Sequence, residues 1–255
     1  MAARSAKRFQ KTKASKRAKL RQKALERESR KKSLTPTVLI VCEGSVTEHS
    51  YLKFIRNSGR HKNVKFHVLE KGTKSHPATV AEEAFKRVSR TGKSDDGGYD
   101  KLFCVIDRDS HSGFDDACNR IRGLAVECGE GYLQYGSELI LSVPCFEFWL
   151  LLHFLQTTKP YERTESKSPC DNVIADLRKF PEFQDYDRKT KGLTKAQCDI
   201  LSEKHETALT NTEYTLAESK KSGNPNPSTN MHILLKYLDG SLRPEEIKPK
   251  KSAKK

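Results

Sequence analysis

The sequence predicts an α/β protein with a mostly parallel sheet and helices on both of its faces. Strand-like apolar segments alternate with helix-like segments over residues 37–158. Some of the strand-like segments are unbroken apolar runs, such as TVLIVC at residues 37–42, which is typical of strands buried on both faces. Alternation favours parallel pairing, because each helix carries the chain back across a face of the sheet.

The individual elements are expected from local patterns. The strands are expected at residues 37–42, 64–69, 100–106 and 138–143. The helices between them are expected at residues 46–58, 78–90 and 115–126, and a further helix is expected to begin at Pro144, because proline is favoured in a first helical turn. Ser45 is the expected N-cap of the first helix, with Glu48 as its capping-box partner.

The pattern changes after about residue 158, where helix-like segments follow one another without strands. These helices are expected at residues 171–180, 194–220 and 229–238. The predicted organisation is a basic tail that is helix-prone or disordered, an α/β domain, a helical subdomain and a second basic, disordered tail, over residues 1–33, 34–158, 159–247 and 248–255.

The positive charge is concentrated at the two ends of the chain. Residues 1–32 hold fourteen Lys and Arg against two Glu, and residues 248–255 hold five Lys without an acid. The whole chain carries +15, so the part between these ends carries −2. Basic tails bind polyanions through counterion release, which makes nucleic acid the expected partner; a tail that only aids solubility is the alternative.

The seven cysteines include no C-x-x-C pair, and Cys42 and Cys104 lie inside apolar runs. This indicates reduced, buried thiols rather than a disulfide framework or a zinc site. No signal-peptide pattern follows the basic N-terminus, and no run approaches the ~20 apolar residues of a membrane span. We therefore expect a cytoplasmic protein without a membrane partner.

Acidic residues follow three of the predicted strands. Glu43 follows the first, Asp107 and Asp109 follow the third, and Glu147 lies in the first turn of the helix after the fourth. Carboxyl ends of parallel strands meet at one edge, where such sheets bind ligands. Asp107 and Asp109 are two apart in an extended segment and so point to one side. Together these four residues are candidate ligands of Mg²⁺ or Mn²⁺.

Each of these acids also has a simpler interpretation. Acids after strands are common as loop residues and helix caps, and Glu147 could merely complement a helix dipole. In the loop after the second strand, Lys71, Lys74 and His76 are candidates for binding a substrate phosphate, with solvated loop residues as the alternative.

Four sequence blocks resemble the RloB family over residues 36–240. They are V-C-E-G-S-V-T-E-x-x-Y (41–51), V-I-D-R-D (105–109), S-V-P-C-F-E-F-W-L-L-L-H-F (142–154) and N-P-S-T-N-M-H (226–232). RloB proteins resemble Toprim-domain proteins, whose signature is a Glu after strand one and an Asp-x-Asp after a later strand. Glu43 and Asp107-x-Asp109 match that signature in place and spacing.

The resemblance implies a Toprim-like α/β domain and a Mg²⁺-dependent nuclease in which Glu43, Asp107 and Asp109 are catalytic. It also implies a role in phage defence beside an AAA/ABC-type ATPase. This chain has no G-x-x-x-x-G-K-[ST] loop of its own, so an ATPase activity would have to come from that partner. The long basic N-terminal tail departs from the family core. A non-catalytic subunit that binds nucleic acid or the ATPase is the alternative function, a primase-like polymerase is a weaker one, and homo-oligomer formation stays open.

Overall fold

The computed structural model describes residues 36–59, 61, 64–69, 76–91, 98–108, 113–128, 133, 135–187 and 192–242. Contacts divide the chain into a unit of residues 1–36 and a second unit that begins at Thr37. Everything described below belongs to the second unit. Of the predicted site residues, Lys71, Lys74 and Asp109 lie outside the described residues.

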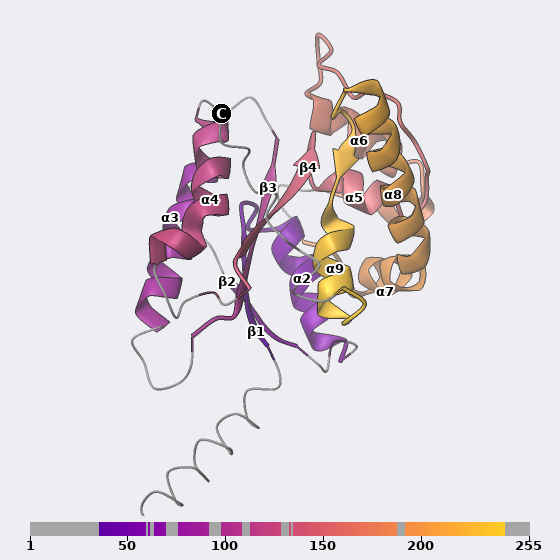
Figure 1. Cartoon of the computed structure of the whole chain (residues 1–255). Coiled ribbons are helices and arrows are strands. Elements are labelled where there is room, and N and C mark those ends of the chain that lie inside the picture. The colour runs from indigo at the N-terminus through magenta and orange to yellow at the C-terminus, as the bar shows by residue number, and fades with distance from the viewer. Residues whose placement is uncertain are drawn as a thin grey trace, which may run out of the picture. The chain divides into compact units, whose positions relative to one another are not determined.

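A five-stranded sheet forms the centre of this unit (Figure 1). Its strands are β1 (Thr37–Cys42), β2 (Lys65–Leu69), β3 (Lys101–Asp107), β4 (Ser137–Val143) and β5 (Ser228–Thr229). The order across the sheet is β2-β1-β3-β4-β5, and the first four strands are parallel. The mostly parallel α/β architecture predicted from the sequence is therefore confirmed.

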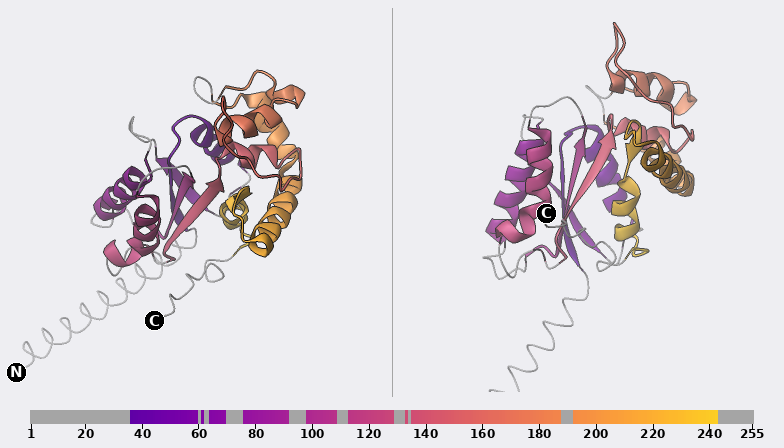
Figure 2. Two further views of the ribbon diagram at one scale, coloured as in Figure 1. Left: turned by 90° about the horizontal axis from the view of Figure 1, so that it is seen from above. Right: turned by 45° about the horizontal axis from the view of Figure 1, so that its top comes forward.

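Helices cover both faces of the sheet (Figures 1 and 2). One face carries α3 (Pro77–Thr91) and α4 (Phe114–Cys128), and the other carries α2 (Thr47–Asn57) and α9 (Met231–Leu238). Each helix has an apolar stripe at helical spacing. In α3 this stripe consists of Val80, Ala81, Ala84 and Val88, all of them buried.

The chain after β4 forms α5 (Glu147–Leu151), α6 (Pro169–Leu177), a 3₁₀ turn (Pro181–Phe183), α7 (Lys195–Glu203) and α8 (His205–Ser222). Three local predictions are wrong here. The helix expected from Pro144 begins at Glu147, after a cis Val143–Pro144 bond. The single helix expected at 194–220 is divided at Lys204, whose backbone leaves the helical region. The region expected to lack strands contributes β5, which pairs antiparallel with β4.

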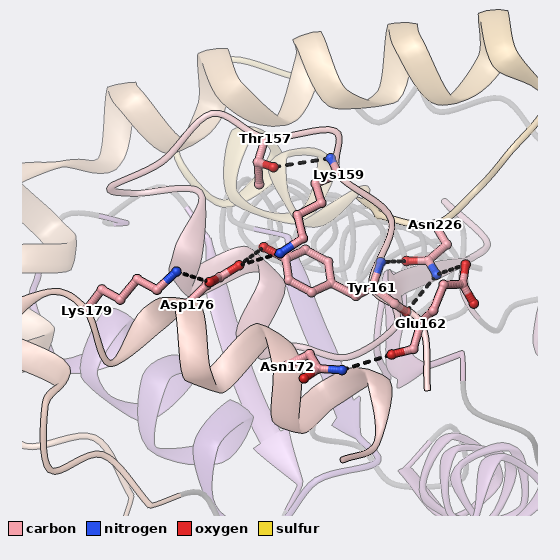
Figure 3. A network of polar contacts seen from close by, with 8 residues as sticks. All are labelled: Thr157, Lys159, Tyr161, Glu162, Asn172, Asp176, Lys179 and Asn226. Atoms are coloured by element: carbon pink, nitrogen blue, oxygen red, sulfur yellow. Dashed lines mark hydrogen bonds and ion pairs between the residues drawn. The ribbon is translucent and has the colours of Figure 1, made fainter. Parts of the chain in front are cut away.

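A polar network ties α6 to the loops beside it (Figure 3). The Tyr161 hydroxyl donates to Asp176 of α6 at 2.9 Å. The main chain of Tyr161 exchanges two hydrogen bonds with the Asn226 amide, at 3.2 and 2.9 Å. Asn226 opens the last of the four RloB-like sequence blocks, so that residue has a structural function: it fixes the segment before β5 against the segment before α6.

The helix α5 is buried on all sides. All five of its residues are at most 4% exposed, and Trp149 is fully buried. Such a helix fits the uniformly apolar sequence around it, because a helix without a polar face has no surface to present to water.

None of the helices in the described part of the chain combines the length and the hydropathy that a membrane crossing requires.

Candidate functional site

The carboxyl ends of β1, β3 and β4 bring three of the predicted acids to one edge of the sheet. β1 and β3 are in register at Cys42 and Val105, and β3 and β4 are in register at Asp107 and Ser142. Glu43 extends β1 by one further backbone bond, in which its N–H donates to Val105 O at 2.8 Å. This parallel register explains why residues 64 positions apart in the chain become neighbours.

Glu43 and Asp107 contact each other directly. The Asp107 N–H donates to Glu43 Oε2 at 3.2 Å, and Glu43 is only 6% exposed. Asp107 is the last residue of β3 and is partly exposed. The Glu43 carboxylate therefore bridges the ends of two strands, and the Oδ1 atom of the Asp107 carboxylate is buried at the same edge.

Glu48 is an additional acid at this edge, which the sequence prediction treated only as a helix cap. The N-cap of α2 is Val46, without a side-chain cap bond, and the Glu48 carboxylate accepts instead from the Gly44 N–H at 3.1 Å. A Cβ at Gly44 would lie 1.9 Å from Glu48 Oε2, so glycine is needed for this approach. The expected Ser45–Glu48 capping box is thus wrong. The signal that could have identified Glu48 is its place in the 41–51 block.

Burial and negatively charged neighbours make Glu48 a weaker acid than an ordinary glutamate. The pKa of Glu48 is raised from 4.5 to about 7, first by burial, then by the charge of Glu147 and then by that of Glu43. The charges of Glu147 and Glu43 both act on the Glu48 carboxyl group. Glu48 is therefore electrostatically coupled to the acid that follows β1 and to the acid that begins α5. A proton on Glu48 lowers the negative charge that this buried cluster would otherwise hold.

Glu147 occupies the other side of the site and is 4% exposed. Its Oε1 accepts from the Tyr186 hydroxyl at 2.9 Å. Tyr186 has one proton and gives it to Glu147, so Thr47 Oγ1 is the donor in its 2.6 Å contact with the Tyr186 oxygen. Burial and the Glu147 charge raise the pKa of Tyr186. Glu147 is therefore an anchored carboxylate in the interior and not a surface residue that only complements a helix dipole.

A disulfide joins Cys145 and Cys170 beside Glu147. Cys145 lies just before α5 and Cys170 in the first turn of α6, and Cys170 Sγ is 3.4 Å from Glu147 Oε2. The expectation that all cysteines are reduced thiols is wrong for this pair. The two residues are 25 positions apart, and only the packing of α5 against α6 brings them together.

The carboxylate oxygens of the site are the ligand type that a hard divalent cation such as Mg²⁺ prefers. Among the described residues, the one group of three or more His, Cys, Asp or Glu ligand atoms within 4.8 Å of one another is Cys145, Glu147 and Cys170. Glu43, Asp107 and Glu147 do not form such a group. Mg²⁺ needs only one or two carboxylates as direct ligands and keeps several waters, through which a more distant carboxylate would act, whereas sulfur ligands do not suit it.

His76 is the one described member of the predicted phosphate-binding loop. It lies directly before α3, where its Nδ1 accepts from the Ala78 N–H at 3.2 Å. This contact satisfies an N–H of the first helical turn and gives His76 a capping function. Its contact with a substrate phosphate stays a prediction, as do those of Lys71 and Lys74.

Comparison with known families adds one finding. The family described as RloB-like protein matches residues 38–238, which include every strand except the first residue of β1. The chain belongs to the RloB-like protein family. Curated proteins and solved structures give no match.

The RloB-like match spans the whole acid site together with its supports. Glu43, Asp107 and Glu147 lie inside the matched range, and so do Tyr186 and the Cys145–Cys170 pair. The basic N-terminal tail lies outside it. The site is therefore built by the part of the chain that defines the family.

The raised pKa of Glu48 predicts how the stability of this RloB-like chain depends on pH. In the metal-free protein the folded state holds the Glu48 proton up to about pH 7, whereas the unfolded state loses it near pH 4.5. Unfolding free energy should therefore fall as the pH rises from about 4.5 to 7, by roughly 3 kcal/mol at 1.36 kcal/mol per pKa unit. Glu48→Gln should abolish this loss and be the more stable protein at pH 8.

Urea unfolding in EDTA at several pH values between 4.5 and 8 measures this effect. Glu165→Gln, which changes an exposed glutamate, is the control and should follow the unmodified protein. Parallel curves for the unmodified protein and Glu48→Gln would contradict the assignment of the pKa to Glu48.

Proposed function

We propose that this RloB-like chain is a Mg²⁺-dependent nuclease of the Toprim type, which cleaves phosphodiester bonds in DNA or RNA. We further propose that it acts with a partner ATPase in defence against phage. The observation that supports the chemistry best is the collection of Glu43, Asp107 and Glu147 at one edge of a parallel sheet, beyond neighbouring strand ends. This is the edge at which open α/β sheets bind their ligands.

The proposed roles follow from position and burial. Asp107, Glu43 and Glu147 would hold the metal, with Asp109 joining them from the Asp107-x-Asp109 sequence pattern. When bound, Mg²⁺ would supply positive charge to balance the phosphodiester in its transition state. Glu43 is the proposed general acid or base, because its Oε2 already accepts the Asp107 N–H and is thereby held at the end of β3. Tyr186 and Thr47 fix the orientation of Glu147.

Cleavage assays test the proposal. Purified protein is incubated with plasmid DNA and with total tRNA in Mg²⁺, in Mn²⁺ and in EDTA, each with and without the product of a neighbouring ATPase gene. Cleavage should require the metal, and the substrate that is cut identifies DNA or RNA as the target. No cleavage under any of these conditions, by a folded protein that still binds nucleic acid, would contradict the nuclease assignment.

A second function, a non-catalytic binding subunit, is favoured by two observations. The carboxylates of Glu43, Asp107 and Glu147 do not converge within 4.8 Å, while the N-terminal tail carries +12. Under this alternative, deleting residues 1–32 should remove most of the measurable function. Under the nuclease proposal, the same deletion should weaken binding and leave metal-dependent cleavage in place.

A further inference from the structure

A positively charged pocket lies at the edge strand β2, apart from the acid site. Strand β2 pairs only with β1, so its other side is the border of the sheet. A cavity of about 330 Å³ lies against it, and its polar lining consists of Arg56, His67, Arg87 and Tyr99. Among the described residues that line this pocket, none is acidic. We call it the β2-edge pocket.

The polar side chains of the β2-edge pocket come from α2, β2, α3 and the loop before β3, and three of them form a chain of contacts. Arg87 Nε of α3 donates to the Tyr99 hydroxyl at 3.2 Å, and the Tyr99 oxygen is 3.4 Å from His67 Nδ1 on β2. Arg56 enters from the last turn of α2. His67 is largely exposed, and partial burial, followed by the charges of Arg87 and Arg56, lowers its pKa, so both guanidinium groups act on the same imidazole. An anion would offset this concentration of positive charge.

The position of the pocket relates it to the acid site. His67 is in register with Leu39 in the middle of β1, and Glu43 lies four residues further along β1 and its extension. At about 3.3 Å per residue, the two places are separated by roughly 13 Å along the strand direction. Four nucleotides of a helical strand cover a similar length, at about 3.4 Å each. One nucleic-acid strand is therefore long enough to reach both places.

We propose that the β2-edge pocket binds a backbone phosphate of a nucleic-acid strand that extends toward the carboxylate edge. Arginine is suited to this function because its planar guanidinium donates two hydrogen bonds to one phosphate. Placing Arg56 and Arg87 on different helices would hold the phosphate between the two layers that flank the sheet. The choice of a nucleic-acid strand as ligand rests on the proposed nuclease function, whereas the anion-binding chemistry rests on the pocket itself.

The test measures how salt affects binding when cleavage is prevented. Anisotropy of a fluorescein-labelled single-stranded RNA is recorded with the full chain in EDTA, between 50 and 400 mM KCl. One phosphate contact adds about 0.7 to the slope of log K against log[salt], which corresponds to about fivefold in affinity between 1 M and 0.1 M salt. Arg56→Ala/Arg87→Ala should lose that slope increment and bind about fivefold more weakly at 0.1 M.

Two control variants separate the pocket from total charge and from folding. Arg120→Ala/Arg122→Ala removes the same charge from α4, where Arg120 already pairs with Glu127, and should bind almost as the unmodified protein does. Arg56→Lys/Arg87→Lys preserves the charge and should restore most of the slope. Equal slopes for the two alanine double variants would overturn the proposal. If the unmodified protein binds inorganic phosphate and Arg56→Ala/Arg87→Ala does not, while the two proteins bind the RNA equally, the pocket takes a free phosphate and its assignment to a strand is overturned.

The outcome for the pocket can be separated from the outcome for the nuclease proposal. If metal-dependent cleavage is found and Arg56→Ala/Arg87→Ala binds and cleaves normally, the pocket proposal alone fails. If the salt slope falls as expected and no cleavage is found under any condition, the pocket remains a nucleic-acid contact and the nuclease proposal fails.

Discussion

Asp107→Asn should reduce metal-dependent cleavage by on the order of 10³-fold. Asparagine keeps the size of the side chain but removes the charge that would hold a divalent cation. Charge stabilisation by a metal contributes several kcal/mol in the transition state, and each 1.36 kcal/mol is a factor of ten in rate. The initial rate of cleavage of the identified substrate, in Mg²⁺ and in Mn²⁺, measures the loss.

The fold should tolerate this change, because the contact between Asp107 and Glu43 uses the main-chain N–H of Asp107. Because Asp107 Oδ1 is buried, the unfolding free energy should shift by about 1–3 kcal/mol, the usual range for a change at a buried polar group, and the protein should stay folded. Asp116→Asn makes the same chemical change at an exposed position of α4 and should cleave as the unmodified protein does. Undiminished cleavage by a folded Asp107→Asn protein would show that the reaction does not use this carboxylate.

Trp149→Ala should lower the unfolding free energy by about 3–5 kcal/mol, the range for truncating a buried aromatic side chain. Trp149 is fully buried in α5, and its ring packs edge-on against Tyr51 of α2 and His153, with centroid distances of 6.4 and 4.7 Å. Its removal would leave a cavity between the helix that carries Glu147 and the helix that carries Glu48. Urea unfolding followed by circular dichroism measures the loss, since Trp149 is the single tryptophan and its fluorescence disappears with the substitution.

A matched truncation lies six residues further along the chain. Leu155→Ala shortens a side chain that is 39% exposed, so it should cost less than about 1 kcal/mol. Trp149→Phe keeps most of the buried area and should lie between the two, which preserves the test if the alanine variant does not fold. A loss below about 1 kcal/mol for Trp149→Ala would contradict the central position of α5 in the core.

Local sequence patterns predicted the four parallel strands well, because these strands contain apolar runs that can be recognised without knowledge of the fold. The runs at 37–42 and 102–106 consist almost wholly of apolar residues, and the structure buries them between two helical layers in parallel pairing. The short strand β5 gave no such signal. Two residues are too few for a pattern, and their strand conformation comes from pairing with Ser142 and Val143.

The sequence by itself determined the α/β class and the presence of acids beyond three strand ends, because both depend on periodicity and on order along the chain. Only the tertiary structure decided which side chains share the site. Glu48 turns inward because Gly44 leaves room for its carboxylate, and Glu147 is fixed by Tyr186, which comes from a segment 39 residues later. Likewise, Arg56 and Arg87 meet at β2 only because α2 and α3 flank the same edge strand. These juxtapositions depend on packing between elements distant in the chain, for which a local pattern contains no information.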